Sequence, residues 1–363
     1  MNEISNAGRL AVLDYARFVA ALSVLFFHWF FKGPMEGWMV IRDFGIWTQI
    51  AGYGYLGVNF FFILSGFVIA MSLKNRSASQ FLRARATRLF PALWASATIT
   101  FLVTLVLAKT PTELTILSSG LSMTFGGDRW ISWAASLTGV PAWFGISAID
   151  ASYWSLLIEA HFYLLVAAVL TSRISKLALL AFILWLVASA LNFFYPTWRF
   201  DMVFVLAWAP YFAAGMLFYR WFEKGLSRSL VGPIILCFVL SLSYAHKSAL
   251  RDGYEIVWLS MLIVGFFFAF FCVVASHRLE KILPSKLAQV LGAISYPLYL
   301  LHQVIGYLVF NWLHLNFTLV QSFPLITLAL LLAVVTLVAY LVNQFVELPS
   351  RNIFRIFHPL SNR

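Results

Sequence analysis

Residues 322–346 read SFPLITLALLLAVVTLVAYLVNQFV, an apolar run that contains no Asp, Glu, Lys or Arg. A helix of about 20 such residues crosses the hydrocarbon core of a membrane, which is roughly 30 Å thick. Runs of this kind recur along almost the whole chain, which predicts an all-α, polytopic transmembrane helical bundle of about ten spans. We expect these spans near residues 11–31, 51–73, 90–108, 152–170, 177–195, 202–219, 230–245, 254–275, 289–312 and 322–346.

The composition of the 363 residues supports this fold class. The chain is 62% hydrophobic and only 11% charged, and its mean hydropathy is +0.86. A water-facing surface cannot be built from it, which excludes soluble enzymes and nucleic-acid-binding proteins. The long runs favour helices over a β-barrel, whose strands alternate weakly over about ten residues. We expect one membrane-embedded domain, 1–363, with no fused soluble domain.

The positive charge of the chain is distributed unevenly. There are 25 Lys and Arg residues against 14 Asp and Glu, a net charge of +11. With the N-terminus inside, most basic residues fall in the inner connections, so the positive-inside rule predicts that both termini are cytoplasmic. This bias explains the basic balance without a nucleic-acid partner. The outer segments carry only Lys32, Arg42, Lys109, Arg129, Arg199, Lys247 and Arg251.

One outer connection, residues 109–151, is much longer than the others and rich in Gly and Ser. Loops of that length are usually functional or disordered. Its tryptophans, Trp130, Trp133 and Trp143, either stack on a sugar or form an aromatic belt at the membrane interface.

The two cysteines, Cys237 and Cys272, both lie inside apolar runs. This position argues against a disulfide framework and against a thiolate metal site. We expect inert packing for both thiols, and no metal in the protein.

The first span carries two ionisable residues at membrane depth, where each costs roughly 3 kcal/mol and is a functional candidate. Arg17 and His28 are eleven residues apart, which places them on one helix face about 16 Å from each other. Asp14 precedes Arg17 by one turn, so the two can pair. The alternative is that Arg17 reaches a lipid phosphate.

Two further spans carry polar residues in register. In the fourth, Ser155, Glu159 and Tyr163 share a face at four-residue steps. The ninth holds Ser295, Tyr296, Tyr299 and His302.

The helical rise places His28, Glu159 and His302 at similar depth in the outer half of the membrane. A carboxylate beside an imidazole is a general-base arrangement, because the acid fixes the tautomer while the other ring nitrogen accepts a hydroxyl proton. His28 with Glu159 suits this arrangement. His302 either joins it or is a structural histidine.

On the inner side, Arg85 and Arg88 share a helical face just before Pro91, at the start of the third span. Such a pair can bind phosphates bidentately. The alternative is ordinary positive-inside anchoring.

Six segments together resemble the acyltransferase-3 family of membrane enzymes, in the order of the family and over nearly the whole chain. Two positions depart from its pattern: Asn59 stands where an acidic residue is frequent, and Tyr15 where glycine is frequent. The matching segments are LDYAR at 13–17 followed by His28, GVNFFFILSGF at 57–67, RATRLFP at 85–91, WSL at 154–156 with Glu159 and Tyr163, LGAISYPLYLLH at 291–302, and ELP at 347–349.

The resemblance implies O-acylation, usually O-acetylation, of a cell-surface polysaccharide or lipid-linked glycan at the outer side of the bacterial inner membrane. The acyl donor it implies is cytoplasmic acetyl-CoA. Combined with the residues above, it suggests His28 as general base, Glu159 as its orienting partner, and Arg17, Arg85 and Arg88 as CoA ligands. Additional site residues on this reading are Tyr163, Ser295, Tyr299 and His302.

Several alternatives stay open at this point. Buried Arg, Glu and His are also typical of a proton-coupled transporter or flippase of a glycan or small molecule. An enzyme of this kind can instead use succinyl-CoA or a small cytoplasmic acceptor. The sequence does not distinguish an acyl-enzyme from direct transfer, and it leaves the acceptor, the oxyanion donors and the oligomeric state open.

Overall fold

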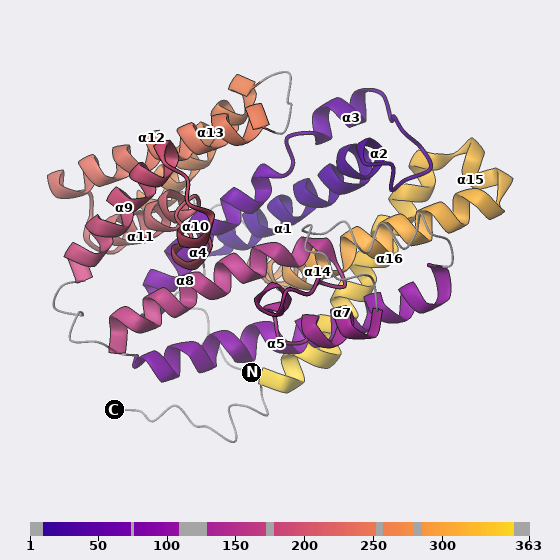
Figure 1. The fold of residues 1–363 in the computed structure, drawn as a ribbon, viewed down its shortest axis with the longest axis horizontal. Coiled ribbons are helices and arrows are strands. Elements are labelled where there is room, and N and C mark those ends of the chain that lie inside the picture. Colours follow the sequence, from indigo (N-terminus) through magenta and orange to yellow (C-terminus); the bar gives the residue numbers. More distant parts are fainter. Residues whose placement is uncertain are drawn as a thin grey trace. The chain divides into compact units, whose positions relative to one another are not determined.

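The computed structural model describes residues 10–73, 76–108, 129–171, 178–251, 257–278 and 285–351. Within these ranges all regular structure is helical and there is no strand, as the ribbon in Figure 1 shows. The prediction of an all-α polytopic bundle is therefore confirmed.

Most of the expected spans correspond to long helical runs. The fifth expected span, near residues 177–195, is a shorter apolar helix of 17 residues, Ala178–Phe194. The protein is therefore an integral, multi-pass membrane protein. Among the described residues, nine runs are long and apolar enough to cross a membrane: Ala11–Met35, Ile46–Ser72, Ala78–Leu107, Ala151–Thr171, Arg199–Lys224, Arg228–Arg251, Val257–Ala275, Lys286–Asn316 and Pro324–Arg351.

The chain divides into two compact units, each built from several segments of the sequence. The first comprises Met1–Ala20, Leu56–Ala78 and Leu165–Ala293, and the second comprises Ala21–Tyr55, Ser79–Leu164 and Ile294–Arg363. Three helices contribute to both units: α1 (Ala11–Phe26), α8 (Trp154–Thr171) and α14 (Ser285–Asn316).

The other elements belong to one unit each, apart from the first residue of α5, Ala78, which falls in the first unit. The first unit contains α4 (Leu56–Ser72), α9 (Ala178–Phe194), α10 (Trp198–Phe204), α11 (Ala209–Lys224), α12 (Arg228–Arg251) and α13 (Val257–Ala275). The second contains η2 (Phe27–Lys32), α2 (Gly33–Met35), α3 (Ile46–Ala51), α5 (Ala78–Leu107, from Ser79), α7 (Arg129–Ser136), η3 (Pro141–Phe144), η4 (Ala151–Tyr153), α15 (Thr318–Ser322), α16 (Pro324–Val342) and η6 (Asn343–Glu347).

The basic segment before the third span belongs to the same helix as that span, which corrects the expected start of the span near residue 90. Helix α5 begins at Ala78 instead of near residue 90, and Pro91 lies inside it instead of at its start. Arginine is a good helix former and its long side chain reaches out of an apolar environment, so the helix continues through the basic residues. Arg85 and Arg88 are consequently held on a rigid element.

Helices α4 and α11 make the most extensive contact among the described helices of the first unit. A Cβ atom on Gly66 would overlap the carbonyl oxygen of Phe212, and one on Gly215 would overlap that of Ile63. Two glycines facing each other's helix let the backbones touch, as small residues do in membrane helix pairs. Gly66 and Gly215 are therefore packing residues of this helix pair.

Both cysteines lie in the first unit as free thiols. Cys237 is buried and Cys272 is half-buried. The expectation that the two do not form a disulfide with each other is confirmed.

We expect Gly66→Ala to destabilise the protein by about 1–3 kcal/mol, because the added methyl group has no room against backbone atoms that cannot move aside. The midpoint of thermal unfolding in detergent or nanodiscs measures this effect. The matched control is Gly265→Ala on α13, where a Cβ atom meets nothing within 4 Å. That variant should keep or raise the midpoint, since alanine is the better helix former. Equal midpoints for both variants would contradict the close packing.

Candidate functional site

His28 lies on a π-helical turn, a feature that hydrophobic periodicity does not reveal. The α-helix α1 ends at Phe26 and continues as η2, which holds Phe27–Lys32. A π-turn widens the helix by one residue and often occurs at functional sites. The His28 side chain is only partly buried, whereas its neighbour Trp29 is fully buried. This turn therefore presents an imidazole on a well-anchored piece of backbone.

The residue that the structure brings to the His28 ring is His302 of α14. His28 Nδ1 and His302 Nε2 are 2.9 Å apart, and the ring centroids are 4.9 Å apart. His302 is fully buried, and its Nδ1 lies 2.7 Å from the carbonyl oxygen of Tyr299. Because a carbonyl only accepts, His302 Nδ1 carries the proton and Nε2 is left as an acceptor.

This arrangement fixes the tautomer of His28 as well. Nδ1 of His28 must donate, because its two neighbours, His302 Nε2 and the Val24 carbonyl oxygen at 2.9 Å, are both acceptors. The lone pair of neutral His28 is then on Nε2. No group in the described part of the chain hydrogen-bonds that nitrogen. His28 Nε2 is thus a base available to a substrate hydroxyl.

Backbone contacts hold the two histidines in place. The Trp29 indole donates to the His302 carbonyl oxygen at 2.8 Å, and the Tyr307 hydroxyl donates to the His28 carbonyl oxygen at 3.2 Å. Gly306 is required here, because a Cβ atom at that position would overlap the Trp29 indole nitrogen. Each histidine backbone is therefore bonded to the helix that carries the other.

The polar face of α8 meets the same part of α14. Ser155 Oγ and the Tyr299 hydroxyl are 2.7 Å apart, and that hydroxyl donates to the Ser152 carbonyl oxygen at 3.0 Å. Ser295, one turn earlier on α14, is also buried. The shared face expected for Ser155 and Tyr163 is thus directed at this helix and at α5.

Glu159 lies in a second polar cluster, away from the ring nitrogens of His28. Its carboxylate accepts a hydrogen bond from the Tyr163 hydroxyl. The buried Arg85 side chain lies against Tyr163 and within electrostatic range of Glu159. Arg85 Nε is buried and has no hydrogen-bond partner among the residues that the structure describes, so it can donate to a ligand. The structure therefore brings Glu159 together with Arg85, and His28 together with His302.

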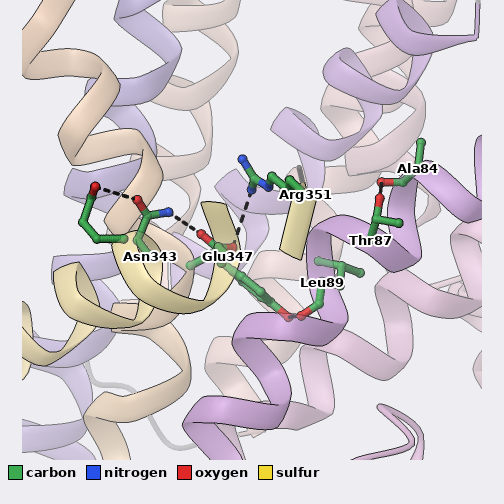
Figure 2. Close-up of polar contacts among 8 residues, drawn as sticks. Ala84, Thr87, Leu89, Asn343, Glu347 and Arg351 are labelled. Carbon is green, nitrogen blue, oxygen red and sulfur yellow. Dashed lines mark hydrogen bonds and ion pairs between the residues drawn. The ribbon is translucent and has the colours of Figure 1, made fainter. Parts of the chain in front are cut away.

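Arg88 extends this cluster toward the last helix. It lies within electrostatic range of Arg85 and of Glu347, a carboxylate that is 2% exposed on η6. Glu347 accepts from Asn343 Nδ2 and lies 3.5 Å from the guanidinium of Arg351, and Figure 2 shows both contacts. Glu347 belongs to the ELP segment at 347–349, which resembles the family pattern, but the sequence indicated no role for it.

Arg17 belongs to the first unit, whereas the other candidate residues lie in the second. It donates to Asp14 at 3.0 Å, which confirms the expected pair. Gly292 packs so closely on Asp14 that a Cβ atom there would overlap the carboxylate. The first segment of the family pattern and the start of the LGAISYPLYLLH segment therefore meet at a buried ion pair.

The described tryptophans of the outer connection make contacts within the protein. Trp133 stacks on Phe101 with centroids 5.2 Å apart, and its indole donates to Thr98 at 3.2 Å. The Trp143 indole donates to His161 Nε2 at 3.1 Å, so His161 is a satisfied, structural histidine. Residues 109–128 of this connection lie outside the described residues.

One candidate residue, Asp150, was not found from the sequence, because a single aspartate in a connection gives no signal. Its side chain is fully buried just before η4. It accepts hydrogen bonds from Ser152 N at 2.9 Å, Ser152 Oγ at 2.7 Å and Val304 N at 3.0 Å. Burial raises the pKa of this carboxyl to about 6, against the opposing effect of the three donors.

The family of this chain is identified by comparison with known proteins. A family model described as an acyltransferase domain, Acyl_transf_3, matches residues 10–343. No curated protein and no solved structure gave a significant match. Since the family model covers most of the chain and the structure provides its membrane helices, the chain belongs to the acyltransferase-3 family and is a membrane acyltransferase.

Proposed function

We propose that this protein is an O-acetyltransferase. It moves an acetyl group from cytoplasmic acetyl-CoA to a sugar hydroxyl of a cell-surface polysaccharide or lipid-linked glycan, at the outer side of the bacterial inner membrane. The observation that carries the proposal is the hydrogen-bonded pair of His28 and His302, which leaves His28 Nε2 as a base. A histidine base of this kind activates a hydroxyl for attack on a thioester.

In the proposed reaction, His28 acts first as a base and then as an acid. The sugar oxygen attacks the thioester carbonyl carbon while its proton passes to His28 Nε2, which forms a tetrahedral intermediate. The carbon–sulfur bond then breaks, and the CoA sulfur leaves with the proton returned by the His28 imidazolium. Throughout the reaction His302 Nε2 accepts a hydrogen bond from the Nδ1–H group of His28, and this hydrogen bond stabilises the imidazolium. The products are the acetyl ester and free CoA.

The arginine cluster is proposed as the binding site for the phosphates of CoA. Arg85 and Arg88 lie on one helix, and within the described part of the chain the buried Arg85 Nε is a donor without a partner. Guanidinium groups bind phosphate through paired hydrogen bonds. Glu159 and Tyr163 lie against Arg85 and hold its side chain. Arg17, paired with Asp14, is proposed to contribute to donor binding from the first span.

We expect Arg88→Gln to raise the KM for acetyl-CoA by about 10-fold or more, because a hydrogen bond to a charged group contributes roughly 1.5–3 kcal/mol. The KM for acetyl-pantetheine, which lacks the nucleotide phosphates, should not change. Steady-state kinetics with both donors measure the difference. The matched control is Arg83→Gln, on the same helix but exposed. An equal effect on both donors would contradict phosphate binding by Arg88.

The proposed reaction is tested by CoA release from acetyl-CoA. The purified protein in nanodiscs is given a panel of membrane glycan precursors, with succinyl-CoA as a second donor. Release that depends on both acetyl-CoA and an acceptor is the expected result. A preference for succinyl-CoA would show that the donor is succinyl-CoA and not acetyl-CoA. Transfer to a soluble small molecule would show that the acceptor is not a glycan. Monodisperse protein without release from any donor, but with net glycan flux in liposomes, would favour a transporter.

A further inference from the structure

The buried carboxylate of Asp150 connects two helices at the level of the histidine pair. Oδ1 accepts from the backbone and hydroxyl of Ser152, at the start of the chain segment that leads into α8. Oδ2 accepts from the backbone N–H of Val304, two residues after His302 on α14. One carboxylate thus binds both segments, and it does so with no exposure to solvent.

The residues after Asp150 bind the preceding turn of α14. The Tyr153 hydroxyl donates to the Leu300 carbonyl oxygen at 3.3 Å. Ser155 Oγ and the Tyr299 hydroxyl are 2.7 Å apart. Residues 150–155, which we call the clamp segment, therefore hold α14 on both sides of His302.

The position of His302 depends on this turn. Its Nδ1 donates to the Tyr299 carbonyl oxygen, and its Nε2 must lie 2.9 Å from His28. Pro297 lies inside α14, five residues before His302. Proline has no backbone N–H, so α14 lacks one of its own hydrogen bonds near this position and is held less firmly by them. External hydrogen bonds from the clamp segment therefore set where His302 sits.

We propose that Asp150 is a positioning residue for acyl transfer: by binding the backbone of Val304, it holds His302 at hydrogen-bonding distance from the base His28. The inference rests on the proposed function. Asp150 does not touch the substrate or the ring of either histidine in this role. It acts through the backbone of α14, as groups that support a catalytic constellation do.

The role requires the ionised form of Asp150. All three partners are donors in the observed geometry, and a carboxylate is the state that accepts from all of them. The titratable groups that face it are Tyr153 of η4 and Tyr299 and Tyr307 of α14. Phenols supply no positive charge, so burial dominates and the pKa of Asp150 is about 6. The carboxylate predominates above about pH 7, and the neutral acid below about pH 5.

The test is Asp150→Asn, assayed with acetyl-CoA and acceptor in nanodiscs across pH 5 to 8. We expect kcat at pH 7.5 to fall about 10-fold or more, because small displacements of catalytic groups have large effects. The KM for acetyl-CoA should not change, since the arginine cluster is untouched. The ratio of wild-type to variant kcat should shrink toward pH 5, where the wild-type residue is neutral too.

The matched control is Asp201→Asn in the first unit, where Asp201 also accepts from a backbone N–H, that of Ala207 at 2.7 Å. It should leave kcat and the pH profile unchanged. A kcat for Asp150→Asn equal to wild type, or a ratio independent of pH, would overturn the inference. Wild-type protein without acetyl transfer would instead overturn the proposed function.

A second variant covers the case in which Asp150→Asn does not fold. Ser152→Ala removes the hydroxyl donor at 2.7 Å but keeps the carboxylate and its bond to Val304. Losing a donor makes the carboxylate harder to form, so the acid limb of kcat should move to higher pH. An unmoved acid limb would show that Asp150 ionisation does not control the reaction.

Discussion

His28→Ala is expected to reduce kcat for acyl transfer by roughly 100- to 10,000-fold, the range that general-base catalysis contributes. The variant removes the nitrogen that is proposed to accept the hydroxyl proton, and it leaves the arginine cluster in place. The KM for acetyl-CoA should therefore stay close to the wild-type value. CoA release from acetyl-CoA, measured with acceptor in nanodiscs, gives both constants.

The control is a histidine in the same unit that is not part of the pair. His161 Nδ1 donates to the Leu157 carbonyl oxygen, and His161 Nε2 accepts from the Trp143 indole. His161→Ala should therefore leave kcat unchanged. If His28→Ala keeps wild-type turnover in folded protein, the base has been assigned to the wrong residue. Loss of activity in both variants would point to damage to the fold instead.

His302→Gln is expected to lower kcat on the order of 10- to 100-fold, the usual effect of removing a group that orients a functional histidine. The loss is smaller than for His28→Ala because the Val24 carbonyl oxygen still accepts from His28 Nδ1. The substitution removes the imidazole nitrogen of His302 that holds the His28 ring and stabilises its imidazolium form. The split between kcat and KM is the measurement, and the KM for acetyl-CoA should remain unchanged.

Glu159→Gln provides the contrast, because the sequence suggested Glu159 as the partner that orients His28. The structure brings His302 to that nitrogen and Glu159 to Tyr163 and Arg85. We therefore expect Glu159→Gln to act mainly on the KM for acetyl-CoA. A large loss of kcat in Glu159→Gln, together with normal turnover in His302→Gln, would restore the original assignment.

The spans could be predicted from the sequence because crossing a membrane is a local property of about 20 consecutive residues. The run at 322–346 is sufficient by itself to identify α16. The start of a helix is not predicted in this way where the helix begins outside the apolar run. Helix α5 begins at Ala78 and includes Arg85 and Arg88, since arginine suits a helix and its charge reaches beyond the apolar region.

Contacts within one helix were also predictable, because they depend only on the helical repeat. The Asp14–Arg17 pair and the contact of Tyr163 with Glu159 join residues three or four positions apart. A prediction of this type does not require knowledge of which helices are neighbours.

The all-α membrane fold and the candidate site residues other than Asp150 could be predicted from the order of amino acids alone. The pairing of these residues depends on the packing of distant helices: His28 lies with His302, Glu159 with Arg85, and Asp150 with the backbone of α14. Positions along separate helices are estimated to several ångströms from the helical rise, whereas a hydrogen bond tolerates a few tenths of an ångström. The π-turn at His28 and the packing of distant helices supply that missing accuracy.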